Sequence, residues 1–472
     1  LAPMSHRCPD GSGIWTGPGV GLGHLRLAII DREGGAQPMV SAPGDLVVTY
    51  DGEIYNFAAL RAELAAKGHS FRTSSDTEVI LHGWRQWGER CVEHFDGMFA
   101  FALYDARARS LWLVRDRFGV KPLHYARLAD GSLIFASELK GVLAHPALRR
   151  APDFTAVEDY LTYGYVPDDA CMVRGVHKLG AGEALLAVRG RPLPPPSRYW
   201  DISFADRARE KSADLEAELR ELLRAAVRSR MVADVPLGAL LSGGVNSSTV
   251  VAFMAAASTQ AVRTCTIGFD VAALDETGDA DRIARRFGTE HRSRIVSSDD
   301  FGLIDTVAAH FDEPFADASA LPIYRLYELA REQVIVALSG DGADEGFAGY
   351  RRHRCQHREE ALRRLLPAAL RRAVFGPLGR LYPKATLAGL AASGAEAYAA
   401  AVSVTPAAIR RQLWVDPLRA ELAGYRAQER YIAAMRDAPA RDPLDRAQYA
   451  DIKIWLPGDI LTKTDRMSMA VG

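Results

Sequence analysis

The sequence lacks the features of several broad classes of protein. No run of apolar residues approaches the length of a membrane span, and the first residues, LAPMSHRCPD, do not form a signal peptide. A formal net charge of -1 gives no basic surface for nucleic acid. No internal repeat or long low-complexity tract is present. We therefore expect no membrane and no nucleic-acid partner.

Cysteine is also scarce, and its spacing excludes two further classes. The chain has 5 cysteines, an odd number, and none forms a Cys-x-x-Cys pair. They are far apart in the sequence, at Cys8, Cys91, Cys171, Cys265 and Cys355. This pattern favours reduced thiols in a cytoplasmic protein over a disulfide framework or a zinc site.

The composition is that of a globular protein with more than one domain. At 472 residues, with 48% hydrophobic and 25% charged residues, the chain is long enough for two or three domains. From residue 13 to about residue 200, short β-type runs such as 46–50 and 98–104 are separated by turns, with two helices near 57–67 and 78–87. This predicts an α+β domain with antiparallel sheets.

The pattern changes after a proline-rich stretch. Residues 189–197 (RGRPLPPPS) cannot form a regular helix or a central strand, so we place the domain junction there or just after Trp200. Beyond it, strands alternate with helices, which predicts parallel βαβ units in a doubly wound sheet. The expected elements are helices at 213–231, 247–257 and 279–287, and strands ending at 241, 263–269 and 333–338. The last third, rich in Ala, Arg and Leu, predicts a helical array.

One expected strand leads into a glycine turn and a helix start, at residues 240–248 (LLSGGVNSS). Gly243 and Gly244 allow positive φ and close approach of backbone N–H groups to an anion, while three serines add hydroxyl donors. This predicts a phosphate-binding loop, although it lacks the lysine of a Walker A motif. An ordinary turn between strand and helix is the alternative.

A second polar loop follows the strand at 333–338. Residues 339–345 (SGDGADE) place Asp341, Asp344 and Glu345 beside glycines. Ligands bind beyond the carboxyl ends of strands in such sheets, and a magnesium-nucleotide site needs acidic groups near its phosphate loop. A solvated acidic turn is the alternative.

Considered together, these motifs resemble those of glutamine-hydrolysing asparagine synthetases, over essentially the whole chain. The matching N-terminal stretches are residues 6–10 (HRCPD), 22–27 (LGHLRL), 34–38 (GGAQP), 51–56 (DGEIYN), 75–78 (SDTE) and 115–123 (RDRFGVKPL). The C-terminal ones are the 242–248 and 339–345 loops, 456–459 (LPGD) and Lys463 with 465–469 (DRMSM).

For the N-terminal half, the resemblance implies a glutaminase domain of the N-terminal-nucleophile hydrolase type at residues 1–200. Arg26 would hold the α-carboxylate of glutamine through a bidentate pair, and Asp76 its α-amino group. Gly52 would donate its N–H to the oxyanion, and Asp51 and Glu53 would belong to the same glutamine-binding pocket.

For residues 201–472, the resemblance implies an ATP-pyrophosphatase domain similar to adenine nucleotide α-hydrolases. Lys463 would stabilise charge on the phosphorus and the departing pyrophosphate, with Asp341 at the nucleotide. Asp344 and Asn246 would bind Mg²⁺. The ATP-binding residues would be Leu241, Ser242, Gly243, Gly244, Asn246, Ser247, Ser248, Ile267, Ser339, Gly340 and Asp341.

Several positions depart from the family pattern. The family nucleophile is an N-terminal cysteine, a position absent from this chain, and Cys8 stands where glycine is usual. Asp51 replaces an asparagine, so its charge would repel an oxyanion, and Asn246 replaces an aspartate, which weakens metal binding. We also expect that the chain is truncated at both ends.

The expected function is therefore the ATP-dependent conversion of L-aspartate and L-glutamine to L-asparagine and L-glutamate, with release of AMP and pyrophosphate. Two alternatives remain: an amidotransferase acting on another carboxylic acid, as in polysaccharide-cluster or β-lactam-forming relatives, and a binding or regulatory relative with impaired catalysis. A homodimer is possible.

Overall fold

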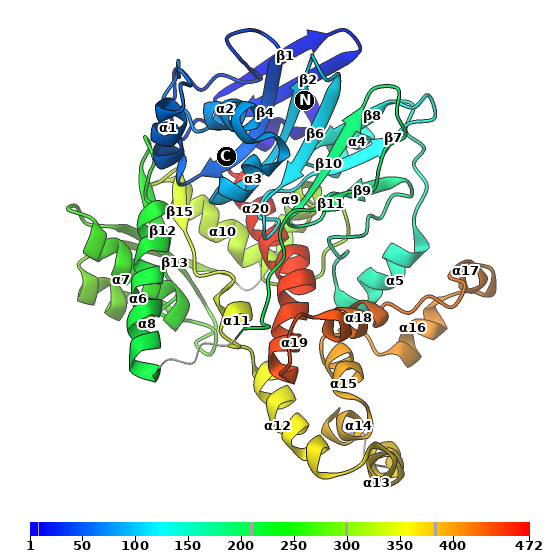
Figure 1. Cartoon of the computed structure of the whole chain (residues 1–472). Helices are drawn as coiled ribbons and strands as arrows, with labels where there is room; N and C mark the ends of the chain where they lie inside the picture. The colour runs from blue at the N-terminus through cyan, green and yellow to red at the C-terminus, as the bar shows by residue number, and fades with distance from the viewer. Residues whose placement is uncertain (8, 207–210, 298–300, 382–384) are drawn as a thin grey trace.

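The structure, a computed structural model, describes residues 1–7, 9–206, 211–297, 301–381 and 385–472 (Figure 1). Cys8, which we interpreted as a departure in the glutamine pocket, lies outside these residues. An antiparallel sandwich is followed along the chain by a parallel sheet and a helical array. Within the described ranges, no helix is both long and apolar enough to span a membrane.

A six-stranded antiparallel sheet forms the centre of the N-terminal domain, in the order β11-β10-β6-β5-β4-β3. Its strands are β3 (Met39–Val40), β4 (Leu46–Ile54), β5 (Gly97–Asp105), β6 (Ser110–Arg115), β10 (Glu183–Val188) and β11 (Ser197–Arg198). Side chains alternate between the two faces of β5. Phe99, Phe101 and Leu103 pack into one core, whereas Ala100 and Ala102 pack into another. The sheet is therefore covered on both faces.

Helices cover one face of this sheet. They are α1 (Phe57–Ala66), α2 (Thr77–Trp87), η2 (Gly88–Arg90) and α3 (Cys91–His94). Leu60 and Leu64 of α1 and Val79 and Ile80 of α2 join Phe101 in the core beneath them. The helical spacing of these apolar residues explains why the sequence places both helices correctly.

A second, divided β-layer covers the other face. It consists of the hairpin β1 (Gly11–Gly17) and β2 (Val20–Arg26) and of a sheet in the order β8-β7-β9. The strands of that sheet are β7 (His124–Arg127), β8 (Leu133–Ala136) and β9 (Val176–Lys178), and the short helices of this domain are η1 (Ala2–Arg7), α4 (Leu139–Leu143) and α5 (Phe154–Tyr163). The predicted α+β antiparallel sandwich is thereby confirmed.

The C-terminal domain contains a four-stranded parallel sheet in the order β14-β13-β12-β15. Its strands are β12 (Leu237–Leu240), β13 (Arg263–Phe269), β14 (Glu290–Val296) and β15 (Val336–Leu338). Strand order reverses between β12 and β15, and ligands bind at such a point in open α/β sheets. The predicted parallel sheet is confirmed, and both predicted loops follow the two strands at the reversal.

Helices pack on both faces of the parallel sheet. They are α6 (Ser212–Ser229), α7 (Val245–Ala257), α8 (Thr277–Phe287), η3 (Phe301–Leu303), α9 (Ile304–His310) and α10 (Ala320–Arg331). Val227, Val251 and Ala280 form a core with β12, while Leu329 and Ala330 of α10 pack against β13. The sheet is therefore doubly wound, as predicted.

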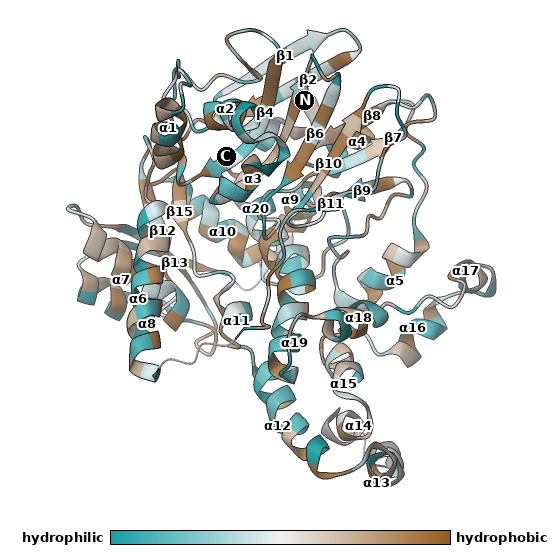
Figure 2. Cartoon of the chain, in the orientation of Figure 1, coloured by the Kyte–Doolittle hydropathy of each residue, from teal (hydrophilic) through white to brown (hydrophobic). Residues whose placement is uncertain are grey.

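The remaining helices form the array expected from the composition. They are α11 (Ala343–Gly346), α12 (Arg351–Leu365), α13 (Ala368–Leu381), α14 (Ala385–Ala391), α15 (Gly394–Ala401), α16 (Ala407–Leu413), α17 (Asp416–Glu421), α18 (Glu429–Asp437), α19 (Pro443–Ala450), the π-helix η4 (Asp451–Leu461) and α20 (Thr462–Ala470). Figure 2 shows that α12 is largely hydrophilic, whereas β6 and β10 are mostly hydrophobic. Helix α20 contacts both η1 and α10, so it lies between the two domains (Figure 1).

Candidate active sites

The two loops predicted to bind ATP meet at one edge of the parallel sheet. Residues 242–248 follow β12, and residues 339–345 follow β15. A Cβ built on Gly340 would lie 2.8 Å from the Cβ of Asn246, so the two loops are in contact. The strand order places both loops at the crevice where ligands bind in such sheets.

Gly243 makes the turn into α7 possible. Its φ is +79°. A Cβ at this position would lie 2.6 Å from the Cβ of Asp279 and 2.8 Å from the backbone nitrogen of Ala280. Gly244 differs, because it is the N-cap of α7 and has a φ of -69°. The positive φ expected at both glycines therefore occurs at Gly243 alone.

The hydroxyl groups of Ser242 and Ser247 form hydrogen bonds within the 242–248 loop, and that of Ser248 forms none within the described residues. The Oγ atoms of Ser242 and Ser247 are 3.1 Å apart, and the buried Oγ of Ser248 has no hydrogen-bond partner within the described part of the chain. No side chain caps the first turn of α7. The N–H groups of this turn and the hydroxyls are donors suited to a phosphate.

Two further predicted ATP-binding residues lie on the strands beside this loop. Leu241 is buried, and its N–H donates to the carbonyl of Cys265 at 2.9 Å. Ile267 is half-buried in β13 and is paired in register with Arg294 of β14. Leu241 directly follows β12 and Ile267 lies within β13, so both residues border the crevice.

The predicted catalytic residues Asp341 and Lys463 are joined through Thr464. The Oγ1 of Thr464 donates to the Oδ2 of Asp341 at 3.2 Å, and the Oγ of Ser339 donates to the same oxygen at 2.8 Å. Lys463 precedes Thr464 in α20, and only 5% of its surface is exposed. Helix α20 therefore places Lys463 near the 339–345 loop, at the edge of the crevice predicted to bind ATP.

The two predicted metal ligands come from opposite loops. Asp344 lies in α11 and packs against the backbone of Gly349, and Asn246 lies in the first turn of α7. In the described ranges, no group of three or more His, Cys, Asp or Glu side chains is arranged to hold a metal ion. A magnesium ion here would need phosphate oxygens as further ligands, so its binding stays a prediction.

The second predicted site lies in the N-terminal domain. The residues predicted to bind glutamine line one cavity, although they come from β2, β4 and the start of α2. They are Arg26, Asp51, Gly52, Glu53 and Asp76. The hairpin, the antiparallel sheet and the start of α2 thus bring together every residue predicted for this pocket.

Backbone carbonyl groups hold the guanidinium of Arg26 in place. Nη1 donates to the carbonyl of Arg32 at 2.7 Å, and Nη2 donates to that of Asp31 at 2.7 Å. Burial lowers the pKa of Arg26, but an arginine keeps its charge at neutral pH. A cation fixed in this way is suited to a carboxylate.

Asp76 and Glu53 are two buried carboxyl groups of the same pocket. The Oδ2 of Asp76 accepts hydrogen bonds from the hydroxyl of Tyr50 at 2.6 Å and from the N–H of Ile54 at 3.0 Å. Burial raises the pKa of both acids, and the charge of Asp76 raises that of Glu53 further. A cationic amino group in the pocket would relieve this repulsion.

Gly52 lies in β4 opposite Phe99 of β5. Its φ is +150°, and a Cβ would lie 2.7 Å from the Cα of Phe99. Any other side chain would therefore collide with the backbone of β5. Only glycine keeps this segment of the pocket wall in place.

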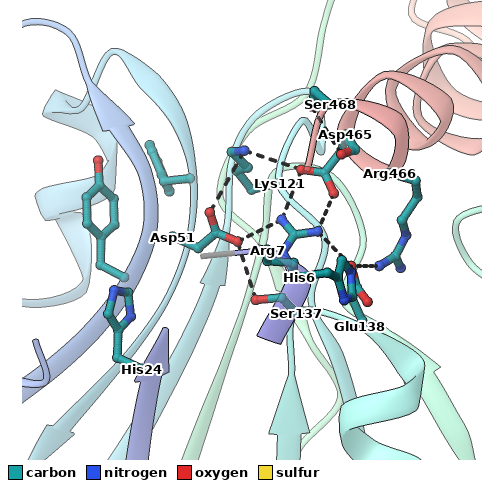
Figure 3. A network of polar contacts seen from close by, with 12 residues as sticks. His6, Arg7, His24, Asp51, Lys121, Ser137, Glu138, Asp465, Arg466 and Ser468 are labelled. Carbon is teal, nitrogen blue, oxygen red and sulfur yellow. Dashed lines mark hydrogen bonds and ion pairs between the residues drawn. The ribbon is translucent and has the colours of Figure 1, made fainter. Parts of the chain in front are cut away.

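Asp51 takes part in a network that links the two domains (Figure 3). Its Oδ2 accepts hydrogen bonds from Arg7 at 3.1 Å and from Ser137 at 3.4 Å, and its Oδ1 lies 3.9 Å from the Nζ of Lys121. The negative charge expected to repel an oxyanion is thus paired with cations, which reduces that repulsion.

Arg7 connects this pocket to helix α20. Its two terminal nitrogens donate to the two carboxylate oxygens of Asp465, at 2.7 and 3.1 Å, and Lys121 donates to the same group at 3.3 Å. Arg466 is paired with Glu138 at 2.5 Å. We call Arg7, Asp51, Lys121, Glu138, Asp465 and Arg466 the interdomain network. Through Arg7 and Lys121, this network connects Asp51 to Asp465 of the helix that carries Lys463.

Sequence reasoning missed the functional neighbours of several predicted residues. Arg7 and Lys121 lie within motifs that carry the family resemblance, but the spacing of those motifs predicts no interaction for either residue. Asp317 and Ser319 contact Lys463, yet they are 146 and 144 residues away in the sequence. No local pattern reveals a contact of that kind.

The described cysteines lie outside the glutamine pocket. Cys91, Cys171 and Cys265 are buried, Cys355 is exposed, and none of the four lines the cavity. Burial raises the pKa of Cys171 to about 12 and that of Cys265 to about 11. Each of these buried thiols stays protonated at neutral pH, so neither is an activated nucleophile.

An antiparallel sandwich with a polar cavity, joined to a doubly wound parallel sheet, is the architecture of a two-domain amidotransferase. A family model described as a glutamine amidotransferase domain matches residues 1–200, and one described as asparagine synthase matches residues 218–472. The chain belongs to the asparagine synthase family.

The most similar relatives include bacterial and archaeal proteins. Asparagine synthetase [glutamine-hydrolyzing] 1 of Bacillus subtilis (strain 168) is 32% identical over 471 residues, which cover 98% of this chain and 73% of that protein. A putative asparagine synthetase [glutamine-hydrolyzing] of Mycobacterium tuberculosis (strain ATCC 25618 / H37Rv) is 34% identical, over 99% of this chain and 74% of that protein. A putative asparagine synthetase [glutamine-hydrolyzing] 2 of Methanocaldococcus jannaschii is 37% identical, over 77% of this chain and 74% of that protein.

Proposed function

We propose that this protein is an ATP-dependent ligase that forms L-asparagine from L-aspartate with ammonia derived from L-glutamine. The observation that carries the proposal is the match of both halves of the chain to relatives named glutamine-hydrolysing asparagine synthetases. The N-terminal half also contains a cavity lined by the residues predicted to bind glutamine, and the C-terminal half brings its two predicted ATP loops into contact. We assign the glutaminase domain to residues 1–200 and the synthetase domain to residues 201–472.

The synthetase reaction begins at the 242–248 loop. The free N–H groups of α7 and the hydroxyls of Ser242 and Ser248 bind the phosphates of ATP. An oxygen of the β-carboxylate of aspartate attacks the α-phosphorus, and the bond between that phosphorus and the bridging oxygen breaks to release pyrophosphate. Lys463 balances the charge that develops on the leaving group.

Ammonia then completes the reaction. Its nitrogen attacks the acyl carbon of β-aspartyl-AMP, the carbon–oxygen bond to AMP breaks, and a proton is lost from the nitrogen. The products are asparagine and AMP. Asp341 accepts hydrogen bonds from Ser339 of its own loop and from Thr464 of α20, the residue that follows Lys463. It therefore links the loop predicted to bind ATP to the helix that carries Lys463.

We propose magnesium as the cofactor of the adenylation step. Asp344 would hold it through a carboxylate oxygen and Asn246 through an amide oxygen. The bound ion would neutralise phosphate charge.

The N-terminal pocket binds the glutamine from which the ammonia derives. Arg26 binds the α-carboxylate of glutamine and Asp76 its α-amino group, consistent with their charges and burial. The N–H of Gly52 donates to the oxyanion that forms during amide hydrolysis, and Glu53 shapes the pocket. Asp51, paired with Arg7, forms its wall toward the synthetase domain.

The test is to measure pyrophosphate release from ATP and magnesium with ammonium supplied directly. Ammonium bypasses the glutaminase half, in which none of the described cysteines lines the pocket. We expect release to require L-aspartate. Release only with a different carboxylic acid, or ATP binding without release, would contradict the proposal.

A further inference from the structure

Lys463 is held on two sides by residues that belong to no motif singled out in the sequence. Its Nζ donates to the Oδ2 of Asp317 and to the Oγ of Ser319, the latter at 2.8 Å. The lysine itself is buried, with 5% of its surface exposed. An ammonium group at this depth requires a counter-ion, and Asp317 provides it.

The two partners of Lys463 form a local structure of their own. The N–H and the hydroxyl of Ser319 both donate to the Oδ1 of Asp317 at 2.9 Å. One carboxylate oxygen thus faces Ser319 and the other faces Lys463. The charge of Lys463 and these hydrogen bonds outweigh burial and lower the pKa of Asp317.

This structure is attached to a packed element. Ser319 is the N-cap of α10, whose residues Leu329 and Ala330 pack against β13 of the parallel sheet. Helix α10 also packs directly against α20, through Tyr327 and Met467. The position of Asp317 relative to Lys463 is therefore fixed by the core of the domain.

A second acid lies beside the pair. Asp459 is one turn before Lys463, 2% exposed, and its Oδ1 has no hydrogen-bond partner among the residues described. Burial, together with the charge of Asp317, raises the pKa of Asp459 to about 7. The charge of Lys463 thus acts on both carboxyl groups. If Lys463 moved away, Asp317 and Asp459 would lie side by side without this cation.

We propose that Asp317 and Ser319 are positioning residues that hold Lys463 in the nucleotide-free enzyme and release it to the phosphates of ATP. This inference deepens the proposed function and rests on the assignment of Lys463 to pyrophosphate. After the pyrophosphate leaves, the uncompensated charge of Asp317 draws Lys463 back to its starting position.

The geometry supports such a transfer. Thr464, the next residue, contacts Asp341, and Gly340 beside it touches Asn246 of the 242–248 loop. The residue next to Lys463 is therefore hydrogen-bonded to the 339–345 loop, which borders the proposed phosphate site. A polyphosphate carries more negative charge than a single carboxylate, so it competes successfully for the ammonium.

The first test needs no catalytic activity. We would measure by mass spectrometry how fast an amine-directed acylating reagent modifies Lys463 at pH 8. Asp317→Asn removes the carboxylate that pairs with the ammonium group and stabilises its protonated form, so we expect Lys463 to be modified several-fold faster in this variant. ATP should slow modification in the wild type by occupying the same ammonium group.

Glu313→Gln is the matched control. Glu313 lies four residues before Asp317 in the sequence, and it pairs with Lys178 at 2.6 Å. This variant should leave the modification rate of Lys463 unchanged while raising that of Lys178. An Asp317→Asn protein with the wild-type rate at Lys463 would overturn the proposal, whether or not the enzyme makes asparagine.

The second test uses aspartate-dependent pyrophosphate release. We expect Asp317→Asn to lower kcat by about tenfold while the KM for ATP changes less than about threefold, because the lysine acts on the leaving group. Asp317→Glu should restore part of kcat. If Asp317→Asn does not fold, Ser319→Ala removes the hydrogen bonds of the Ser319 hydroxyl to Asp317 and Lys463 but keeps the counter-ion, and it should show the same trends at smaller size. Unchanged kcat in a folded Asp317→Asn variant would contradict the proposal.

Discussion

Gly52 illustrates how one residue fixes the shape of the glutamine pocket. Its φ of +150° and its closeness to the backbone of β5 leave no room for a side chain. The Gly52 N–H is therefore held in a fixed direction, which an oxyanion-binding group requires. Family resemblance predicts this residue, but only the strand pairing explains why it is glycine.

Replacement of Gly52 by alanine should destabilise the protein by about 3 kcal/mol, because backbone strain adds to a steric collision. Gly44→Ala is the control, since Gly44 has a φ of +77° but no atom within 4 Å of a built Cβ. That change should cost only about 1 kcal/mol. Denaturant unfolding measures both. Equal free energies of unfolding for the two variants would contradict this account of Gly52.

Asn246 is the second position at which a single side chain matters. A carboxylate is a better magnesium ligand than an amide oxygen. We therefore expect Asn246→Asp to raise magnesium-dependent ATP turnover and to lower the magnesium concentration needed for half-maximal rate. Pyrophosphate release measured across a magnesium titration tests this. An unchanged magnesium dependence would remove Asn246 from the metal site.

At the scale of an element, the turn between β12 and α7 combines a required glycine with an uncapped helix start. Gly243 packs against the first turn of α8, whereas Gly244 has a backbone conformation open to other residues. The two neighbouring glycines therefore differ in what they contribute. Gly243 allows the chain to reverse, and Gly244 begins the helix.

We expect Gly243→Ala to weaken ATP binding by about tenfold or more, which corresponds to about 1.4 kcal/mol. The added Cβ would push the turn away from α8 and displace the N–H groups that face the phosphates. Gly244→Ala should weaken binding less. Isothermal titration with ATP compares them, and a stronger effect at Gly244 would show that the turn is not organised as described.

Most elements could be predicted because their cores follow regular spacing. The alternation at Phe99, Phe101 and Leu103 and the helical spacing in α2 both reflect one buried face. Strand β14 escaped prediction because its sequence, EHRSRIV, is mostly polar, and only Val296 is buried. An edge strand that pairs by its backbone leaves little pattern in its side chains.

At the scale of the whole molecule, the interdomain network joins the glutamine pocket to the helix of Lys463. Asp465 lies between Arg7 and Lys121, and all three side chains are largely buried (Figure 3). The network could not be predicted from sequence, since Arg7 and Asp465 are 458 residues apart. Local patterns predict elements, but contacts between distant segments require the folded chain.

Removal of Asp465 should therefore affect both domains. Asp465→Asn leaves Arg7 buried with fewer counter-ions, and we expect it to destabilise the protein by about 3 kcal/mol. Asp416→Asn is the control, because it breaks an exposed pair with Arg419, and it should cost less than about 0.5 kcal/mol. Denaturant unfolding with a probe in each domain measures the effect. An equal loss of unfolding free energy in Asp465→Asn and Asp416→Asn would show that the network does not stabilise the fold.

The same network predicts a dependence on pH. Burial alone would raise the pKa of Asp465, but the charges of Arg7 and Lys121 lower it below its usual range. Its contribution to stability is therefore complete above the unfolded pKa of about 3.9, and it is lost as pH falls below that value. Unfolding measured between about pH 6 and 3 should show less acid sensitivity in Asp465→Asn than in the wild type. Identical pH profiles would contradict this.

The central claim is that the chain joins ammonia to adenylated aspartate. The most direct test is to incubate the protein with ATP, magnesium, L-aspartate and ¹⁵N-ammonium, and to measure asparagine and AMP by mass spectrometry. We predict that each asparagine carries one ¹⁵N and that asparagine and AMP form in equal amounts. AMP and pyrophosphate formed without labelled asparagine, or only with another acid in place of aspartate, would contradict the account.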